Sequence, residues 1–323
     1  MTLTELKYIV AVARERHFGR AADACFVSQP TLSVAVKKLE EELNLQIFER
    51  GATEVSMTPV GEQIVSQAQR VLEQALSIKE IARQGKDPLG APLRLGVIYT
   101  IGPYLLPTLV RQMIERVPQM PLMLQEGYTL KLIELLKQGE IDAAIMALPF
   151  PEVGLTMRAL YDEPFVVALP AGHAWAKRPK INPNDLKQET MLLLGVGHCF
   201  RDHVLGVCPE LMGFSQNTDG IQKTFEGSSL ETIRHMVASG IGITVLPRMS
   251  VHEMSSQAGL LSYVPFDEPV PERRVVVAWR KSFMRTAAID ALCDTLRSCD
   301  LPGVTMLDEK AREKSAAGQR ITL

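Results

Sequence analysis

The chain has 323 residues, of which 46% are hydrophobic and 22% are charged. This length fits two domains, or three small ones, and the composition excludes a disordered chain, a peptide hormone and a disulfide miniprotein. The 35 basic and 37 acidic side chains leave a formal charge of -2. Contact with nucleic acid or an anionic membrane would therefore have to be local, because no global field drives it.

The N-terminus and the cysteines indicate the compartment. The sequence begins without the basic and apolar regions of a signal peptide, and it contains no run of about 18 apolar residues. The five cysteines are an odd number, which is not typical of a permanent disulfide framework. We expect a cytoplasmic protein with no membrane partner, in which any disulfide is transient.

Residues 1–58 have the pattern of a small helical domain that binds DNA. Thr2 and Glu5 can form a capping box for a first amphipathic helix, and small residues around Ala21 favour a second, short helix. Ser28 is a good N-cap for a third helix with Pro30 in its first turn. The polar face of this third helix suits base edges and phosphates in a major groove. It carries Gln29, Thr31, Ser33 and Lys37.

Two short extended stretches around Gly51 and Ala52 predict a wing that brings Arg50 near the DNA backbone. The expected domain is thus a winged helix-turn-helix. A plain helical bundle with solvated polar faces remains an alternative. Residues 1–58 carry seven basic and eight acidic side chains, whereas DNA-binding domains usually have a basic excess.

A long linker helix is predicted to follow, because Thr58 is a good N-cap and Pro59 fits the first helical position. Its apolar residues recur at alternating spacings of four and three, which is a heptad seam. The seam consists of Ile64, Ala68, Val71, Ala75, Ile78 and Ala82. We expect residues 59–90 to dimerise the chain as a coiled coil. The alternative is a single amphipathic helix packed on its own domain.

From residue 91 onward, apolar strand-like runs alternate with helical stretches, which predicts βαβ units around a parallel sheet. Two such series and a late strand at 273–279 predict two α/β lobes with a crossover. The expected parts are an effector domain at 91–307, with lobe I at about 91–161 and 268–300 and lobe II at about 162–267, and a flexible tail at 308–323. A ligand cleft between the lobes would include Thr100 and Thr129.

The string HFGRAADACFVSQPTLSVAVKKLEEELNLQIFER, followed by MTPVGEQ, resembles the winged helix-turn-helix of LysR-type transcriptional regulators. The resemblance extends over the whole chain, since that family joins such a domain through a long linker helix to a two-lobed, periplasmic-binding-protein-like α/β effector domain. It implies a regulator rather than an enzyme, a homodimer assembling to a tetramer on palindromic promoter DNA, and contact with RNA polymerase. It places at the DNA Ser28, Gln29, Pro30, Thr31, Ser33, Lys37 and Arg50.

Two cysteines, Cys199 and Cys208, occur in the stretch GHCFRDHVLGVC. Only a thiolate reacts usefully with peroxide, and a cation such as Arg201 or a protonated histidine would lower the pKa of Cys199. The resulting sulfenic acid can be trapped as a disulfide, for which Cys208 is the nearest partner. A continuous helix would hold the two Cα atoms roughly 13 Å apart, beyond the disulfide limit of about 7 Å. Bond formation would then have to rebuild the helix.

Two other interpretations of these cysteines remain open. Both could be buried small hydrophobic residues, which is the common fate of a free cysteine. A metal site could use His198, Cys199, His203 and Cys208, although their spacing matches no standard zinc pattern.

The same stretch resembles the redox loop of the peroxide-sensing members of the LysR family. This resemblance implies that Cys199 is the peroxidatic residue and that Cys208 is its disulfide partner. It also implies a peroxide pocket that includes Thr100, Thr129, His198, Asp202 and Arg274, the arginine being chosen from the pair Arg273 and Arg274.

The sequence therefore predicts a DNA-binding regulator that senses hydrogen peroxide through a Cys199–Cys208 switch and controls oxidative-stress genes. No cofactor or metal is expected, and resetting would need a thioredoxin-like or glutathione-linked reductant. One alternative is a LysR-type regulator that responds to a small metabolite in the inter-lobe cleft. Another is a thiol peroxidase that uses the same loop.

Overall fold

The computed structural model describes residues 1–50, 55–84, 89–209, 224–227, 229–251 and 259–307. The chain divides into two compact units, the first built essentially from Met1–Gly85 and the second from the remainder. None of the described helices combines the length and the apolar character that a membrane span requires.

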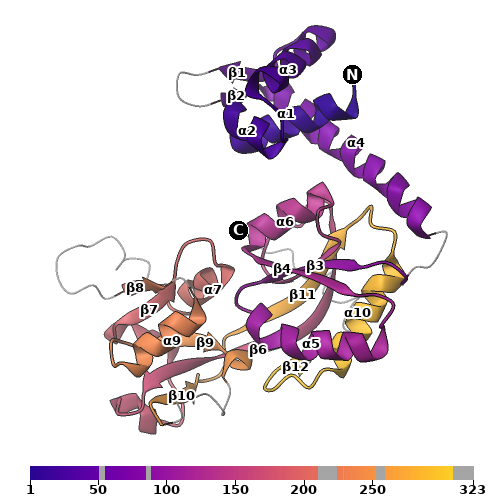
Figure 1. Ribbon diagram of the computed structural model, residues 1–323. Helices are drawn as coiled ribbons and strands as arrows, with labels where there is room; N and C mark the ends of the chain where they lie inside the picture. The colour runs from indigo at the N-terminus through magenta and orange to yellow at the C-terminus, as the bar shows by residue number, and fades with distance from the viewer. Residues whose placement is uncertain (51–54, 85–88, 210–223, 228, 252–258, 308–323) are drawn as a thin grey trace. The chain divides into compact units, whose positions relative to one another are not determined.

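The first unit is the predicted winged helix-turn-helix with its linker helix (Figure 1). It contains α1 (Leu3–Glu15), α2 (Phe18–Ala24), α3 (Gln29–Leu43), the antiparallel pair β1 (Phe48–Arg50) and β2 (Val55–Met57), and α4 (Pro59–Gln84). The predicted caps are confirmed, because Thr2 and Glu5 form a capping box and the Ser28 side chain accepts from the Thr31 N–H. Residues of α1 and α3 such as Ile9, Leu32 and Val36 form the core.

Helix α4 contributes its first half to this core. Val65 and Ala68 are buried, and Ile64 and Val71 are half-buried against the same apolar cluster. Ile78, two turns further on, is 68% exposed. The early residues of the predicted seam therefore pack within their own domain, whereas Ile78 is an exposed apolar residue.

The second unit is built around an eight-stranded sheet. In lobe I, the parallel strands β3 (Leu93–Ile98), β4 (Leu122–Gly127) and β5 (Ala143–Ala147) alternate with α5 (Gly102–Arg116) and α6 (Thr129–Gln138). Late in the chain, β11 (Glu272–Arg280) pairs with β5, and α10 (Thr286–Ser298) and β12 (Thr305–Met306) follow. These elements confirm the predicted α/β alternation of this lobe and the return of the late strand.

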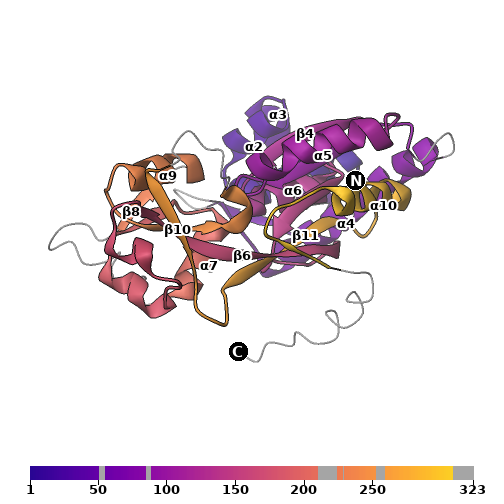
Figure 2. The same cartoon turned by 90° about the horizontal axis from the view of Figure 1, so that it is seen from below.

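Lobe II contains a second, two-stranded parallel sheet of β7 (Met191–Leu194) and β8 (Thr224–Gly227). Its other elements are α7 (Cys199–Val207), α9 (Leu230–Ala238), β9 (Thr244–Pro247), β10 (Leu261–Pro265) and the 3-10 turns at Ala174–Lys177, Pro183–Gln188 and Arg248–Ser250. Figure 2 shows β10 beside β6 in this lobe.

One long strand, β6 (Leu155–Pro170), runs through both lobes (Figure 1). Its first part pairs with β11 and its second part with β9 and β10. The boundary that the sequence predicted between the lobes, at about residues 161 and 162, therefore lies inside a strand. Tyr161 and Asp162 are buried there and pair with β11. The expected flexible tail, 308–323, lies outside the described residues.

Candidate functional site

The two cysteines of the predicted loop lie at the two ends of one helix. Cys199 is the first residue of α7, His198 is its N-cap, and Cys208 is its C-cap. Neither cysteine is in a disulfide; Cys208 is buried in the core of lobe II, whereas Cys199 is only half-buried. The segment is thus helical in the dithiol form, and a direct bond between the two ends is excluded by the helix geometry.

The end of β3 and the starts of α6 and α7 meet at one cavity, and the predicted residues Thr100 and Thr129 lie there with Cys199. Thr100 follows β3, Thr129 begins α6, and both are buried, with exposures of 3% and 6%. Together with Cys199 and His198 they line a cavity of about 10 Å³, which is roughly the space that one water-sized molecule needs. The Thr129 hydroxyl has no nitrogen or oxygen partner among the described residues. Its interaction with the Cys199 sulfur acts to lower the pKa of that thiol. The pocket therefore offers a thiol and two hydroxyls to a very small polar molecule.

The arginine at this pocket is Arg273, and the prediction of Arg274 is corrected. Arg273 donates to the Thr100 hydroxyl over 2.8 Å and to the Thr100 carbonyl over 2.9 Å. It also pairs with the buried Glu163 and lies 5.2 Å from the Phe200 ring. Arg274 binds Asp162 at 2.8 Å instead. Neighbouring residues on a strand point to opposite faces, so only one of the two arginines can reach Thr100.

The electrostatics of Cys199 differ from the expectation. Burial raises the pKa of the Cys199 thiol, whereas the Thr129 hydroxyl and the Arg273 guanidinium act to lower it. Arg201, expected to supply the cation, donates to the Leu194 carbonyl over 3.0 Å. The other expected cation, a protonated histidine, is not His203, because burial lowers the pKa of that imidazole. Arg273 therefore has the role expected of Arg201.

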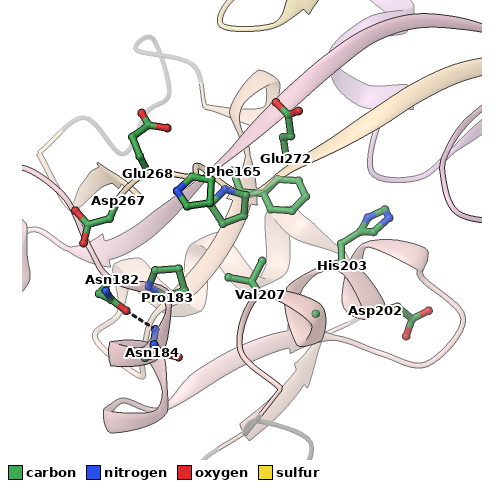
Figure 3. A pocket seen from close by; sticks show the side chains of 13 residues that line it. Phe165, Asn182, Pro183, Asn184, Asp202, His203, Val207, Asp267, Glu268 and Glu272 are labelled. Atoms are coloured by element: carbon green, nitrogen blue, oxygen red, sulfur yellow. Dashed lines mark hydrogen bonds between the residues drawn. The ribbon is translucent and has the colours of Figure 1, made fainter. Parts of the chain in front are cut away.

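Asp202 does not line the small pocket. It is exposed on α7 and borders a second hollow of about 610 Å³, together with His203 and Val207 (Figure 3). His203 Nε2 donates to the Leu148 carbonyl over 2.7 Å, which ties α7 to the end of β5. The rim of this hollow is acidic, with Asp267, Glu268 and Glu272.

Three aromatic rings lie at the small pocket, of which His198 was predicted from the sequence and the two tyrosines, Tyr99 and Tyr128, were missed. Tyr99 and Tyr128 pack edge to face at 5.2 Å between ring centroids, and the Tyr128 and His198 rings are 4.8 Å apart. Tyr99 and His198 are 5.9 Å apart. A signal was present, because each ring directly precedes one of the pocket residues Thr100, Thr129 and Cys199 in the chain.

The first unit presents the predicted DNA-binding residues near the N-terminus of α3. Ser28, Gln29, Pro30, Thr31 and Lys37 are exposed and Ser33 is half-buried. Val34, which was not predicted from the sequence, is 67% exposed on the same helix, where an apolar side chain suits a thymine methyl. Arg50 ends β1, and its side chain and the wing tip at 51–54 lie outside the described residues.

A metal centre is not supported at either site. Among the residues that the structure describes, no three His, Cys, Asp or Glu side chains are grouped so as to hold an ion. The side chains of His198, Cys199, His203 and Cys208, which all lie in the described part, are thus not brought together as a group of ligands.

Comparison with known proteins settles the family. Residues 3–62 match the family model of bacterial regulatory helix-turn-helix proteins of the lysR family, and residues 86–299 match the LysR substrate binding domain. The chain belongs to the LysR family. As a LysR-family chain it is a DNA-binding regulator and not an enzyme, and the fold class predicted from the sequence is confirmed.

The relatives of this LysR-family chain share most of its length. A hydrogen peroxide-inducible genes activator from Pectobacterium carotovorum subsp. carotovorum is 38% identical over 297 residues, which are 92% of this chain and 96% of that protein. The structure of full-length OxyR C199D from Pseudomonas aeruginosa is 51% identical, with a TM-score of 0.68, over 95% of this chain and 99% of that one. A reduced form of OxyR from N. meningitidis is 44% identical, with a TM-score of 0.63, over 67% of this chain and 99% of that one.

Proposed function

We propose that this LysR-family regulator senses hydrogen peroxide through a Cys199–Cys208 thiol–disulfide switch and controls oxidative-stress genes. The observation that carries the proposal is the arrangement of two cysteines, neither in a disulfide, at opposite ends of α7, with Cys199 at a water-sized pocket. The names of the relatives, which include a hydrogen peroxide-inducible genes activator, support the same function.

The pocket groups fit the first chemical step. The Cys199 thiolate attacks one peroxide oxygen, the O–O bond breaks, and the departing hydroxide takes up the proton released by the thiol and leaves as water. Because the Thr100 hydroxyl already accepts from Arg273, its own proton is free to hydrogen-bond a peroxide oxygen. Arg273 and Thr129 favour the thiolate. Cys199 becomes a sulfenic acid.

The second step forms the disulfide. The Cys208 sulfur attacks the sulfenic sulfur, the S–OH bond breaks, and a second water leaves with the Cys208 proton. One peroxide thus oxidises two thiols and gives two waters. Because α7 holds the two sulfurs apart, the helix must unwind and Cys208 must leave the lobe II core. Gly206, which is exposed and lies two residues before Cys208 in α7, makes this unwinding easier because glycine destabilises a helix.

The partners follow from the proposed role. The promoter DNA would be palindromic and bound through α3 of a dimer that assembles to a tetramer, and the regulator would act on RNA polymerase in the cytoplasm. A thioredoxin-like or glutathione-linked reductant would restore the dithiol.

The test is a thiol count and peptide map by mass spectrometry, before and after one equivalent of hydrogen peroxide. We expect rapid loss of two thiols and a Cys199–Cys208 crosslink. The crosslink should be absent in Cys199→Ser and retained in Cys293→Ser, whose position is buried away from α7. A second measurement concerns DNA. Sequences are selected from a random library with the reduced or the oxidised protein, and the affinities of the two forms for the selected DNA are compared. Slow, unselective oxidation would contradict the proposal and favour a metabolite in the cleft.

A further inference from the structure

The small pocket is bordered by an aromatic cover, defined here as the side chains of Tyr99, Tyr128 and His198. Tyr99 and Tyr128 belong to the turns after β3 and β4 of lobe I, and His198 caps α7 of lobe II. The three rings contact one another pairwise, with centroid distances of 4.8 to 5.9 Å. All three residues line the same cavity as Thr100, Thr129 and Cys199.

We propose that Tyr99 and Tyr128 determine which peroxides reach Cys199, admitting hydrogen peroxide and excluding organic hydroperoxides that carry a bulky alkyl group. This inference rests on the proposed function. It adds a specificity role for two side chains that take no part in the bond-making steps.

Size is the first argument. The cavity of about 10 Å³ holds one water-sized molecule, and a tert-butyl or cumyl group cannot fit beside Thr100 and Thr129 in it. The sheet contributes to the lining of this cavity Ile98 of β3 and Gly127 of β4, and both are buried in the core. Enlargement of the pocket must therefore come from the aromatic cover and not from the sheet.

The exposure of the rings is the second argument. Tyr99 and Tyr128 are 42% and 43% exposed, whereas His198 is 6% exposed. The tyrosines thus separate the pocket from solvent, with one side of each ring toward the pocket and the rest in water. A side chain in this position controls access without belonging to the core, so its removal opens the pocket at little cost to the fold.

The contact of Tyr128 with the α7 end of the site is the third argument. Gly197 has φ +102°, and a Cβ added there would lie 3.4 Å from the Tyr128 ring. The ring therefore lies directly over the backbone that leads into His198 and Cys199. A bulky peroxide substituent would have to displace this ring before its oxygen reached the sulfur.

The experiment compares the rates at which hydrogen peroxide and tert-butyl hydroperoxide oxidise Cys199 in the full-length protein, with the crosslink quantified by mass spectrometry. The alkyl peroxide reacts in the same way, with an alcohol leaving instead of the first water. We expect Tyr99→Ala and Tyr128→Ala to raise the ratio of the alkyl-peroxide rate to the hydrogen-peroxide rate by roughly tenfold or more. The ratio is the readout because a change in the thiolate fraction multiplies both rates equally.

Two variants complete the design. Tyr128→Phe retains the ring and should retain the discrimination of the native chain. Leu130→Ala removes an apolar side chain, 66% exposed, just outside the pocket lining and serves as a matched truncation. An unchanged ratio in both tyrosine-to-alanine variants, with folding verified by circular dichroism, would overturn the inference. Failure of the native chain to oxidise Cys199 with hydrogen peroxide would instead overturn the proposed function.

Discussion

The reactivity of Cys199 depends on a balance between burial and two polar neighbours. Burial raises the pKa of its thiol, so a smaller share of the protein holds the reactive thiolate at neutral pH. The Thr129 hydroxyl and the Arg273 guanidinium oppose this effect. Arg273 is held in place by Glu163 and by both oxygens of Thr100, so the cation is fixed by the same residue that lines the pocket.

This balance predicts the effect of replacing Thr129 by Val, which keeps the shape and removes the hydroxyl. The pKa of Cys199 should rise further. The thiolate fraction below the pKa falls about tenfold for each unit of upward shift, so alkylation by iodoacetamide should slow at neutral pH and its pH profile should move to higher pH. At pH values above both pKa values, the two proteins should react alike. Thr129→Ser keeps the hydroxyl and should keep the native pH profile. Coincident pH profiles for Thr129→Val and the native protein would show that the hydroxyl does not lower the pKa of Cys199.

At the scale of the element, α7 is the part of lobe II that the proposed switch must rebuild. Its N-terminal end is fixed at the pocket, its middle by the bond from His203 to the Leu148 carbonyl, and its C-terminal end by buried Cys208. In the proposed switch, a Cys199–Cys208 disulfide would remove the first and the last of these constraints together. We therefore expect the helix to persist only while both cysteines are reduced.

Hydrogen exchange tests this conclusion directly. In the dithiol form, the amides of α7 (Cys199–Val207) should be protected, and after oxidation their exchange should accelerate by roughly tenfold or more, because the helical hydrogen bonds are lost. Helix α9 of the same lobe (Leu230–Ala238) provides the internal reference and should change far less. Equal protection of α7 in the two redox states would mean that the disulfide does not act through this helix.

The sequence predicted the short regular elements well. It did not predict the full length of β6, the choice of Arg273 or the aromatic cover, because these depend on contacts between distant segments. Helices α1, α3 and α4 follow apolar periodicity and caps that are local in sequence, whereas β6 runs unbroken because β11 pairs with it from more than 100 residues away. At the site, the motif indicated Thr100, Thr129 and Cys199, but strand register decides between Arg273 and Arg274. The two tyrosines of the aromatic cover directly precede Thr100 and Thr129 in the chain, but their contact with His198 depends on the fold, which brings separate segments together.

At the scale of the whole molecule, α4 is the helix through which we expect two chains to dimerise. The first half of α4 packs on its own domain through Val65 and Ala68, so only the later part of the predicted seam is available to a second chain. Ile78 is the clearest such position, because it is a large apolar side chain of the later part of α4 that is 68% exposed. Two chains that bury this residue against each other would present two copies of α3 to a palindrome.

We therefore expect Ile78→Glu to weaken the dimer. Each chain loses the burial of an isoleucine, about 1.5–3 kcal/mol, and the two copies together should raise the dimer dissociation constant by roughly a hundredfold or more. Sedimentation velocity over a dilution series measures this constant, and binding to the selected DNA should weaken in parallel. Ser66→Glu introduces the same charge on the exposed polar side of α4 and serves as the control. If Ile78→Glu dimerises as tightly as Ser66→Glu, the two chains meet elsewhere and Ile78 is not at their interface.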